Sequence, residues 1–298
     1  MNINGIEIDD TFAEAFGMTA TRLLITAHNK KWCRNAAESM TGFATSVIGC
    51  GVEAGIEREW SKDETPDGRN GISVLLFGMS TSDLAKQFEK RVGQCVLTCP
   101  TTAIFSGIED GKPIPLGKRL RFFGDGHQIS KMISGKRYWR VPVMDGEFLC
   151  EESAGSCKAV GGGNFLVLAE KLPQALQACE HSIEKMRKLP NVIMPFPGGV
   201  VRSGSKVGSK YKSLIASTND AFCPTLTGQV KTELTKDIGA VLEIVIDGLT
   251  ENDVAQAMTV GIRAACSGGA NSSIKKITAG NYGGKLGKHH FHLHELLK

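Results

Sequence analysis

Two segments of the chain, 170 positions apart, repeat one pattern of apolar and polar residues. Each begins with apolar residues at every second position and runs into a glycine, which is typical of a buried strand and its end. The strand residues are Ile72, Val74, Leu76 and Gly78 in the first copy, and Leu242, Ile244, Ile246 and Gly248 in the second. A repeat of this length predicts a duplicated structural unit.

A helix is predicted after each of these strands. Ser80 with Asp83, and Thr250 with Asp253, match a capping box, in which a hydroxyl and a carboxylate accept the first free amide protons. Apolar residues then follow at helical spacing in both copies, namely Leu84, Phe88 and Val92, and Val254, Met258 and Ile262. The two units therefore match in their caps as well as in their apolar faces.

A further strand and helix precede each unit, at Arg22 to Thr26 and Asn29 to Met40, and at Asn164 to Glu170 and Leu172 to Leu189. Pro173 fits the first turn of the last helix. The predicted apolar face of that helix consists of Leu172, Leu176, Cys179, Ile183 and Met186. Each half thus has the order βαββαβ, which predicts an α+β fold of two ferredoxin-like (split βαβ) units.

The length of 298 residues suits two domains of ordinary size. We expect an N-terminal lobe over residues 1–152 and a C-terminal lobe over residues 153–298, with the boundary near Ser153 to Lys158. The segment Arg119 to Glu152 is expected to add strands that bridge the halves, because it carries two hairpin signals. These signals are Asp125-Gly126 and Asp145-Gly146.

Composition narrows the classes of function. With 41% hydrophobic and 22% charged residues, the chain is typical of a compact globular protein. The net charge of +4 is mild and no basic run is interleaved with aromatic residues, so we expect no nucleic-acid partner, whereas small anionic ligands stay compatible. We also expect a cytoplasmic protein without a membrane segment, because neither a leader pattern nor a long apolar run is present. Nine cysteines without a Cys-x-x-Cys pair predict reduced thiols.

Glu243 is the first candidate for chemistry. It lies within Ala240 to Ile246, an otherwise apolar strand, where burial would raise the pKa of a carboxyl group. The equivalent residue in the first copy is Ser73, so the acid occurs in one half only. The alternative is a plain alternating strand whose polar residues, Glu243 and Asp247, point to water.

The segment Pro195 to Lys212 combines glycines, two Gly-Ser-Lys triplets and several cations, among them Arg202, Lys206 and Lys210. Backbone amides and cations of this kind hold phosphate or carboxylate groups. A Walker loop is excluded, because Ser205-Lys206 reverses the required order of lysine and hydroxyl residue. A flexible, solvated connection is the alternative.

Three other groups of polar residues have competing interpretations. Ser217, Thr218, Asn219 and Asp220 either polarise a carbonyl group or close an Asx turn. Three histidines near the end, His290, His292 and His294, are expected on one face of an exposed terminal strand, and no metal site is predicted. A catalytic thiol would have to be Cys95, Cys99 or Cys223, but no base is identified for any of them.

Long motifs spread along the chain resemble one family, the formylmethanofuran:tetrahydromethanopterin formyltransferases. The motifs in the first half are NGIEIDDTFAEAF (4–16), TGFATSVIGCGVEAGIE (41–57), ETPDGR (64–69), GQCVLTCPTTAIFSG (93–107) and FFGDG (122–126). Those in the second half are GGGNFLVLAE (161–170), PFPGGVVRSGSKVGSK (195–210), ASTNDAFCPT (216–225), LEIVIDGL (242–249) and ITAGNYGGKLGKH (277–289). The slightly basic charge, and Cys50-Gly51 in place of a Cys-Pro, resemble the bacterial branch whose members form one subunit of a formyltransferase/hydrolase complex.

The resemblance implies a duplicated ferredoxin-like fold, a homotetramer and direct formyl transfer between methanofuran and tetrahydromethanopterin without an acyl-enzyme. It places the family's acid on Glu243, as general acid and base. We add the hypotheses that Ser217 to Asp220 stabilise an oxyanion and that the Gly-Ser-Lys loop holds anionic carrier tails. A thiol-dependent acyltransferase and a noncatalytic subunit that positions a hydrolase are the alternatives.

Overall fold

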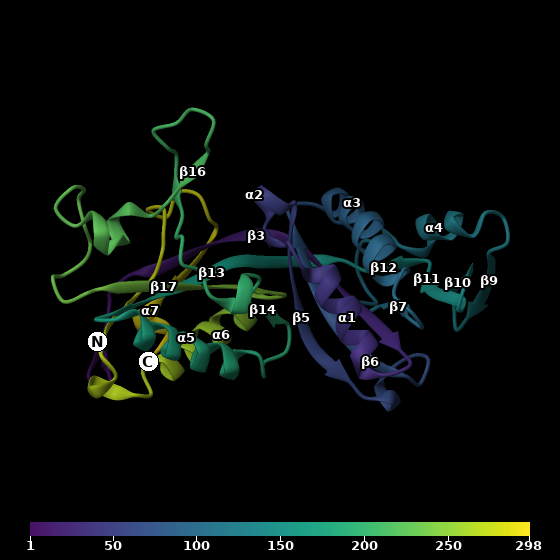
Figure 1. The fold of residues 1–298 in the computed structure, drawn as a ribbon, viewed down its shortest axis with the longest axis horizontal. Coiled ribbons are helices and arrows are strands. Elements are labelled where there is room, and N and C mark those ends of the chain that lie inside the picture. The colour runs from purple at the N-terminus through teal and green to yellow at the C-terminus, as the bar shows by residue number, and fades with distance from the viewer.

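The computed structural model describes residues 1–298 as an elongated molecule with one mixed sheet of 15 strands along its length. Both termini lie at the end formed by the second half of the chain (Figure 1). The other end consists of β9 (Ile129–Ile133), β10 (Lys136–Val143) and β11 (Gly146–Glu151). None of the helices is both long and apolar enough to cross a bilayer.

The first half contributes four neighbouring strands in the order β7-β3-β6-β5, with two helices on one face. The elements are β3 (Phe12–Ala27), α1 (Lys30–Thr41), β5 (Val52–Trp60), β6 (Asn70–Gly78), α3 (Thr81–Arg91) and β7 (Ala103–Ser106). Leu23, Ile72 and Val74 face these helices and are buried in a core of 27 residues. The alternate strand positions, among them Leu24 and Ser73, therefore lie on the other face.

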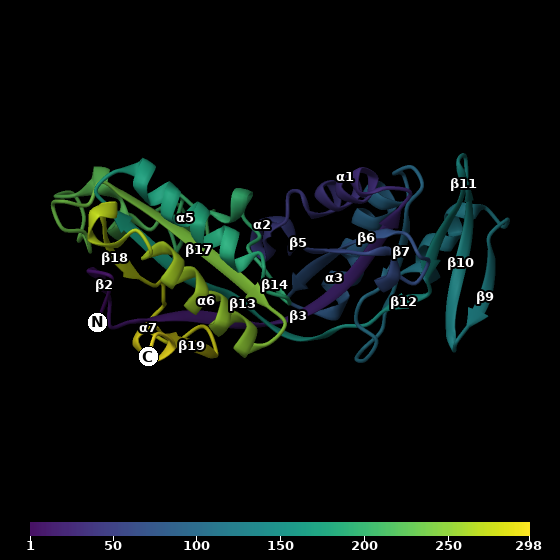
Figure 2. The same cartoon turned by 90° about the horizontal axis from the view of Figure 1, so that it is seen from below.

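The second half has the corresponding order β18-β13-β17-β14, again with two helices on one face (Figure 2). Its elements are β13 (Cys157–Ala169), α5 (Leu172–Met186), β14 (Val192–Ile193), β17 (Ala240–Gly248), α6 (Glu251–Ala265) and β18 (Ile274–Thr278). Phe165, Leu242 and Ile244 face the helices within a core of 29 residues. The predicted mixture of helices with a large sheet is confirmed.

The remaining elements are short. They are β1 (Asn2–Ile3), β2 (Ile6–Ile8), β4 (Thr45–Ser46), α2 (Val47–Cys50), β8 (Ile114–Pro115), α4 (Gly117–Leu120), β12 (Ser153–Ala154), β15 (Lys206–Val207), β16 (Ala216–Ser217), β19 (His289–His292) and α7 (Leu293–Leu296). Single-turn helical segments follow or connect several of them, at 62–64, 92–96, 121–124, 197–199, 220–222, 224–226 and 269–272.

Strand β3 joins the two halves, and it is much longer than the predicted strand at Arg22 to Thr26. Its second part pairs with β6, whereas Phe16 to Ala20 pair with β13 and Phe12 to Ala15 pair with β19. Ala13 and Ala15 are consequently buried in the core of the second half. The division into lobes 1–152 and 153–298 stays a prediction.

Both predicted helix caps are present. The hydroxyl of Ser80 accepts the amide of Asp83 at 3.2 Å, and the hydroxyl of Thr250 accepts that of Asp253 at 3.1 Å. The predicted helix beginning after Asn29 is also confirmed, since this side chain accepts the amide of Trp32 at 3.2 Å. These contacts are local in sequence, which is why the pattern of residues predicts them.

Three details differ from the predictions. Asp125-Gly126 is not a hairpin turn but ends a short helical stretch, and the second hairpin turn is Ser134-Gly135, between β9 and β10. On α5, Leu172 and Leu176 are exposed, because the core begins one turn later at Ala175 and Cys179. His294 lies in α7 rather than in a strand, so it does not share a face with the other two histidines.

A fully buried acid and a half-buried acid lie together at the junction of the halves. Asp247 of β17 is fully buried and accepts the amide of Gly162 at 2.9 Å. Burial, and then the neighbouring Glu53 of β5, raise the pKa of Asp247, and burial also raises the pKa of Glu53. Because two neighbouring carboxylates repel each other, the pair favours holding one shared proton. Gly162 has φ +87° in a β-bulge, and this bulge presents its amide to Asp247.

Candidate active site

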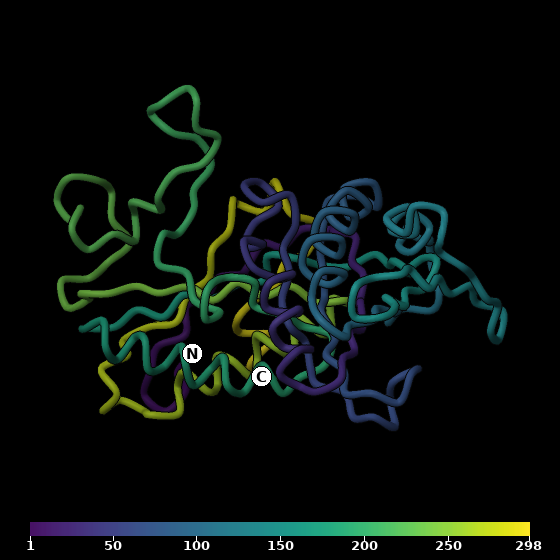
Figure 3. Tube along the Cα trace, turned by 45° about the vertical axis from the view of Figure 1, so that its right-hand side comes forward, coloured from purple at the N-terminus to yellow at the C-terminus, as the bar shows by residue number.

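Glu243 lies on the face of the second sheet that carries no helices. It stands opposite Leu166 of β13, and Leu166 stands opposite Thr278 of β18, so the three side chains form a row on one face. Two segments rise from the sheet on this side, residues 201–239 and the loop 279–288 (Figures 1 and 3). The carboxyl group of Glu243 is thus flanked by loops rather than by a packed helix layer.

The segment 201–239 is attached to the sheet at both ends. Val201 and Glu243 exchange main-chain hydrogen bonds of 2.8 and 3.0 Å. At the other end, Leu234 and Ile238 pack in a small apolar cluster with Leu166 and Leu168 of β13. The segment therefore forms one wall beside Glu243 and keeps water from part of the sheet face.

The carboxyl group of Glu243 has no charged partner. No hydrogen bond or ion pair joins its side chain to another residue, and no lysine or arginine offsets its burial. Burial raises the pKa of Glu243 to about 7. The side chain retains some exposure. A carboxyl in this setting is protonated in a large fraction of molecules near neutral pH and can both give and take a proton.

The loop 279–288 is held by one buried carboxylate, that of Glu14 on β3. Its two oxygens accept four amides of the loop, from Tyr282 and Leu286 at 2.6 Å, Gly284 at 2.8 Å and Gly287 at 2.6 Å. Burial alone would raise the pKa of Glu14, but these four hydrogen bonds outweigh it and lower the pKa to about 2. Glu14 therefore stays ionised and fixes the shape of the loop.

Asn164 ties the same loop to the sheet. Its side-chain amide donates to the carbonyl of Gly280 at 3.1 Å and its oxygen accepts the amide of Gly280 at 2.6 Å. Asn164 is two residues from Leu166 on β13, so it lies on the face that carries Glu243. The loop is thereby anchored next to the proposed acid.

Tyr282 is the aromatic residue of this loop. Its ring lies 6.1 Å from that of Phe16, between ring centroids. Burial, and then the negative charges of Glu243 and Glu14, raise the pKa of the Tyr282 phenol. The phenol is therefore neutral and a hydrogen-bond donor at any physiological pH.

Several residues of the predicted binding set lie together at one end of a hairpin. Lys206 forms an ion pair with Asp220 at 2.5 Å and pairs through its main chain with Ser217. The hydroxyl of Ser217 donates to the carbonyl of Gly208 at 2.7 Å, and that of Thr218 donates to the carbonyl of Ser203 at 3.0 Å. These residues brace the base of the hairpin formed by β15 and β16.

The other members of that set are distributed differently. Asn219 is half-buried and precedes a short helical turn that ends at Phe222, but its side chain makes no capping hydrogen bond, so the turn lacks the side-chain bond of an Asx turn. Arg202 and Lys210 are exposed and form no ion pair, so their cations are free for an anionic ligand. Arg202 directly follows Val201, the residue that pairs with Glu243.

Neither Cys223 nor Cys99, two of the candidate catalytic thiols, has a residue nearby that could act as its base. The sulfur of Cys223 lies 3.5 Å from the hydroxyl of Thr218, and no histidine or carboxylate contacts it. Burial, and then Asp145, raise the pKa of Cys99, which lowers its thiolate fraction. Nothing in the geometry activates either sulfur.

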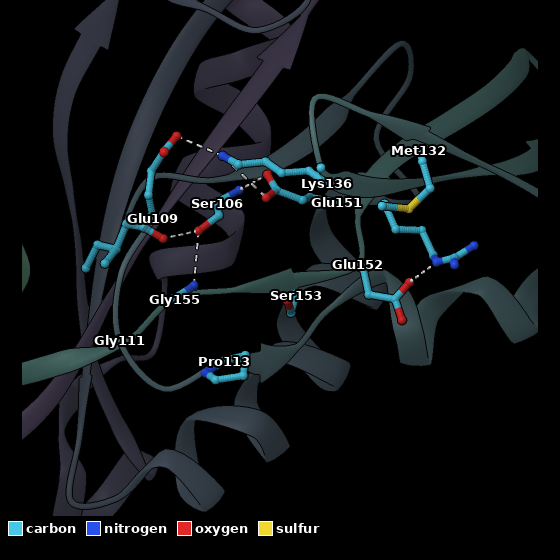
Figure 4. A pocket seen from close by; sticks show the side chains of 13 residues that line it. Ser106, Glu109, Gly111, Pro113, Met132, Lys136, Glu151, Glu152, Ser153 and Gly155 are labelled. Atoms are coloured by element: carbon cyan, nitrogen blue, oxygen red, sulfur yellow. Dashed lines mark hydrogen bonds and ion pairs between the residues drawn. The ribbon is translucent and has the colours of Figure 1, made fainter.

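A cavity lies elsewhere, in the first half of the chain. It has a volume of about 370 Å³ and is lined among others by Ser106, Lys136 and Glu151. Figure 4 shows Lys136 between two carboxylates, and the distance to that of Glu109 is 2.7 Å. Because its charges are paired within the protein and it lacks Glu243, we do not assign the chemistry to it.

Sequence reasoning missed Glu14, Asn164 and Tyr282. Their motifs, at 4–16, 161–170 and 277–289, carry the family resemblance but no local sign of a site. The contacts from Glu14 span 268 to 273 positions, so no local spacing predicts them. The one available signal is the acid at position 14 within the otherwise apolar stretch Phe12 to Met18.

Comparison with known proteins identifies the family. A family model described as formylmethanofuran-tetrahydromethanopterin formyltransferase matches residues 1–143, and one described as the proximal lobe of FTR matches residues 146–296. The chain belongs to this formyltransferase family. The resemblance found in the sequence is confirmed.

Full-length relatives agree with this assignment. A formylmethanofuran--tetrahydromethanopterin formyltransferase of Methylobacillus flagellatus is 69% identical, with 100% of both chains covered. One subunit of the formyltransferase/hydrolase complex of Methylorubrum extorquens is 53% identical over 99% of this chain and 97% of its own.

Two solved structures share the fold. The formyltransferase/hydrolase complex of Methylorubrum extorquens with methylofuran matches with a TM-score of 0.98 and 52% identity, covering 100% of this chain and 99% of that one. The formyltransferase of Methanosarcina barkeri matches with a TM-score of 0.93 and 48% identity, covering 99% and 100%.

Proposed function

We propose that this chain transfers a formyl group directly between a ring nitrogen of tetrahydromethanopterin and the amine of a methanofuran-type carrier, with Glu243 as the acid and base. The chain is a formyltransferase by family, and the two carriers are its substrates. One observation carries the proposal for Glu243. Its carboxyl lies on the face of the second sheet that carries no helices (the open face), has no charged partner, and has a pKa that burial raises to about 7.

The chemistry needs such a group. When the amine attacks the formyl carbon, a carbon–nitrogen bond forms and the carbonyl electron pair moves to oxygen. Collapse of this intermediate breaks the bond to the other nitrogen, which must receive a proton as it leaves, while the attacking amine must lose one. A carboxyl with a pKa near 7 can supply the first proton and accept the second, so the protein returns to its initial state.

The binding residues are part of the proposal. The exposed cations Arg202 and Lys210 suit anionic carrier tails, and Lys206 would have to exchange Asp220 for a ligand to do the same. The hydroxyls of Ser217 and Thr218 already donate to carbonyl groups, which weakens their assignment as oxyanion donors. Asn219 keeps a free side-chain amide for that task.

The finer assignments of fold, assembly and location also belong here. The order βαββαβ with strand orders β7-β3-β6-β5 and β18-β13-β17-β14 supports two ferredoxin-like units. We expect a cytoplasmic homotetramer, with further subunits of a formyltransferase/hydrolase complex as partners. Since the Methylorubrum extorquens relative is a subunit of such a complex, we expect flux from the pterin to the furan carrier during formaldehyde oxidation.

The test is a coupled spectroscopic assay with both carriers. We expect Glu243→Gln to lower kcat by about 10²- to 10⁴-fold, since an amide cannot exchange the proton. Ser73→Ala, at the matching position of the first half, is the control and should keep the wild-type rate per folded molecule. A full rate in Glu243→Gln, with loss on alkylation of Cys223 or Cys99, would indicate the thiol mechanism instead. Activity only after partner subunits are added would favour the scaffold alternative.

A further inference from the structure

The loop 279–288 places one unused hydrogen-bond donor beside the proposed acid. The phenol of Tyr282 makes no hydrogen bond to the protein, although the residue is half-buried and its main chain is fixed. The hydroxyl reaches solvent, so in the free protein it donates to water. A substrate carbonyl oxygen that displaces this water can accept the same hydrogen bond.

The position of this donor follows from the sheet. Thr278, Leu166 and Glu243 form one row on the open face, and the loop leaves β18 directly after Thr278. Asn164, on the same face, clamps Gly280, two residues before Tyr282. The chain is thus held over the region next to Glu243, and the charge of Glu243 acts on the phenol.

Glu14 determines whether the loop can hold this position. Four amides between positions 282 and 287 converge on its carboxylate, and no cation takes part. Gly283 and Gly284 adopt φ +73° and +69°, a conformation that glycine adopts without strain. Without the carboxylate, the four amides would lose their common acceptor. The observed conformation of the loop would then be less stable.

We propose that Tyr282 donates a hydrogen bond to the formyl oxygen as negative charge develops there, and that Glu14 is the positioning residue that holds Tyr282 in place. This inference rests on the proposed function of Glu243. It assigns the oxyanion donor to a residue whose hydroxyl is free, whereas Ser217 and Thr218 donate theirs to main-chain carbonyls. No bond is made or broken by the phenol, which acts through its dipole.

The test is a double-mutant cycle on the full chain, with partner subunits present if activity requires them, in the assay with both carriers. We expect Tyr282→Phe, which removes only the hydroxyl, to lower kcat about 10- to 100-fold with KM changed by about twofold at most. Glu14→Gln should lower kcat similarly, and the double variant should be no slower than Tyr282→Phe alone. Lys285→Ala, an exposed side chain of the same loop without a hydrogen bond or ion pair, is the control and should leave kcat unchanged.

Each outcome decides between the claims. If Glu243→Gln loses activity and Tyr282→Phe keeps it, the role of Tyr282 is wrong while the proposed function stands. If Glu243→Gln keeps full activity, the proposed function itself fails. If the reductions in kcat caused by Glu14→Gln and Tyr282→Phe multiply in the double variant, Glu14 does not act through Tyr282. Should Glu14→Gln not fold, Gly283→Ala replaces it in the cycle, because a methyl group finds open space there and only the positive φ is disturbed.

Discussion

The matching positions of the two halves, Ser73 and Glu243, have opposite environments. In the first half, Ser73 is fully buried and donates to the carboxylate of Glu57 at 2.8 Å. Arg22 holds Glu57 with two hydrogen bonds of 2.6 and 2.7 Å, and the amide of Asn191 adds a third. In the second half, the carboxyl of Glu243 has no such partners.

The pKa values follow these environments. Burial alone would raise the pKa of Glu57, but hydrogen bonds and the charge of Arg22 lower it below its ordinary value. Burial acts unopposed on Glu243 and raises its pKa to about 7. The corresponding sheets of the two halves thus hold one buried carboxylate that stays ionised and another carboxyl whose pKa is about 7.

The strongest effect on stability is expected in the first half. Arg22→Met should lower the free energy of unfolding by about 3–5 kcal/mol, because it leaves the carboxylate of Glu57 buried without its cation. Denaturant unfolding at pH 7 measures this. Arg34→Met removes two exposed ion pairs, with Glu59 and Glu38, and should change the free energy by less than about 1 kcal/mol. Equal losses in both variants would show that Glu57 is not the sensitive group.

The pH dependence of transfer probes the acid of the second half. If protonated Glu243 is the acid, kcat/KM should fall about tenfold per pH unit above a midpoint near 7, the pKa of this group. The residual activity of Glu243→Gln should show no break at that pH. A break that persists in this variant would belong to another group, such as one of the carriers.

A smaller effect on the free energy of unfolding is expected from Asp247, which lies beside Glu53 where the two halves meet. The pKa of Asp247 is raised in the folded state, so folding takes up a proton and stability falls as pH rises above the ordinary range of the group. Asp247→Asn should therefore raise the free energy of unfolding by roughly 1–2 kcal/mol at pH 8 and change it little at pH 4. The amide oxygen can still accept from Gly162. A gain of equal size at both pH values would contradict the proton-sharing explanation.

Helix caps and strand alternation were predictable because the interacting residues are neighbours in sequence. Ser80 reaches Asp83 within one turn, and the alternation around Leu242 and Ile244 is a property of the strand itself. The hairpin signal at Asp125-Gly126 failed for a related reason, since a left-handed residue ends a helical turn as readily as it forms a hairpin.

The order of amino acids is enough to specify the duplicated strand and helix pattern, the caps and the singular position of Glu243, since these depend on periodicity and on contacts of a few residues. Which carboxylates have partners is settled only when the chain folds. Glu57 meets Asn191 across 134 positions, and Glu14 meets the loop 279–288 across 268 to 273. The pKa of a buried acid depends on the donors and charges that folding brings within a few ångströms of it, and sequence spacing does not encode that distance.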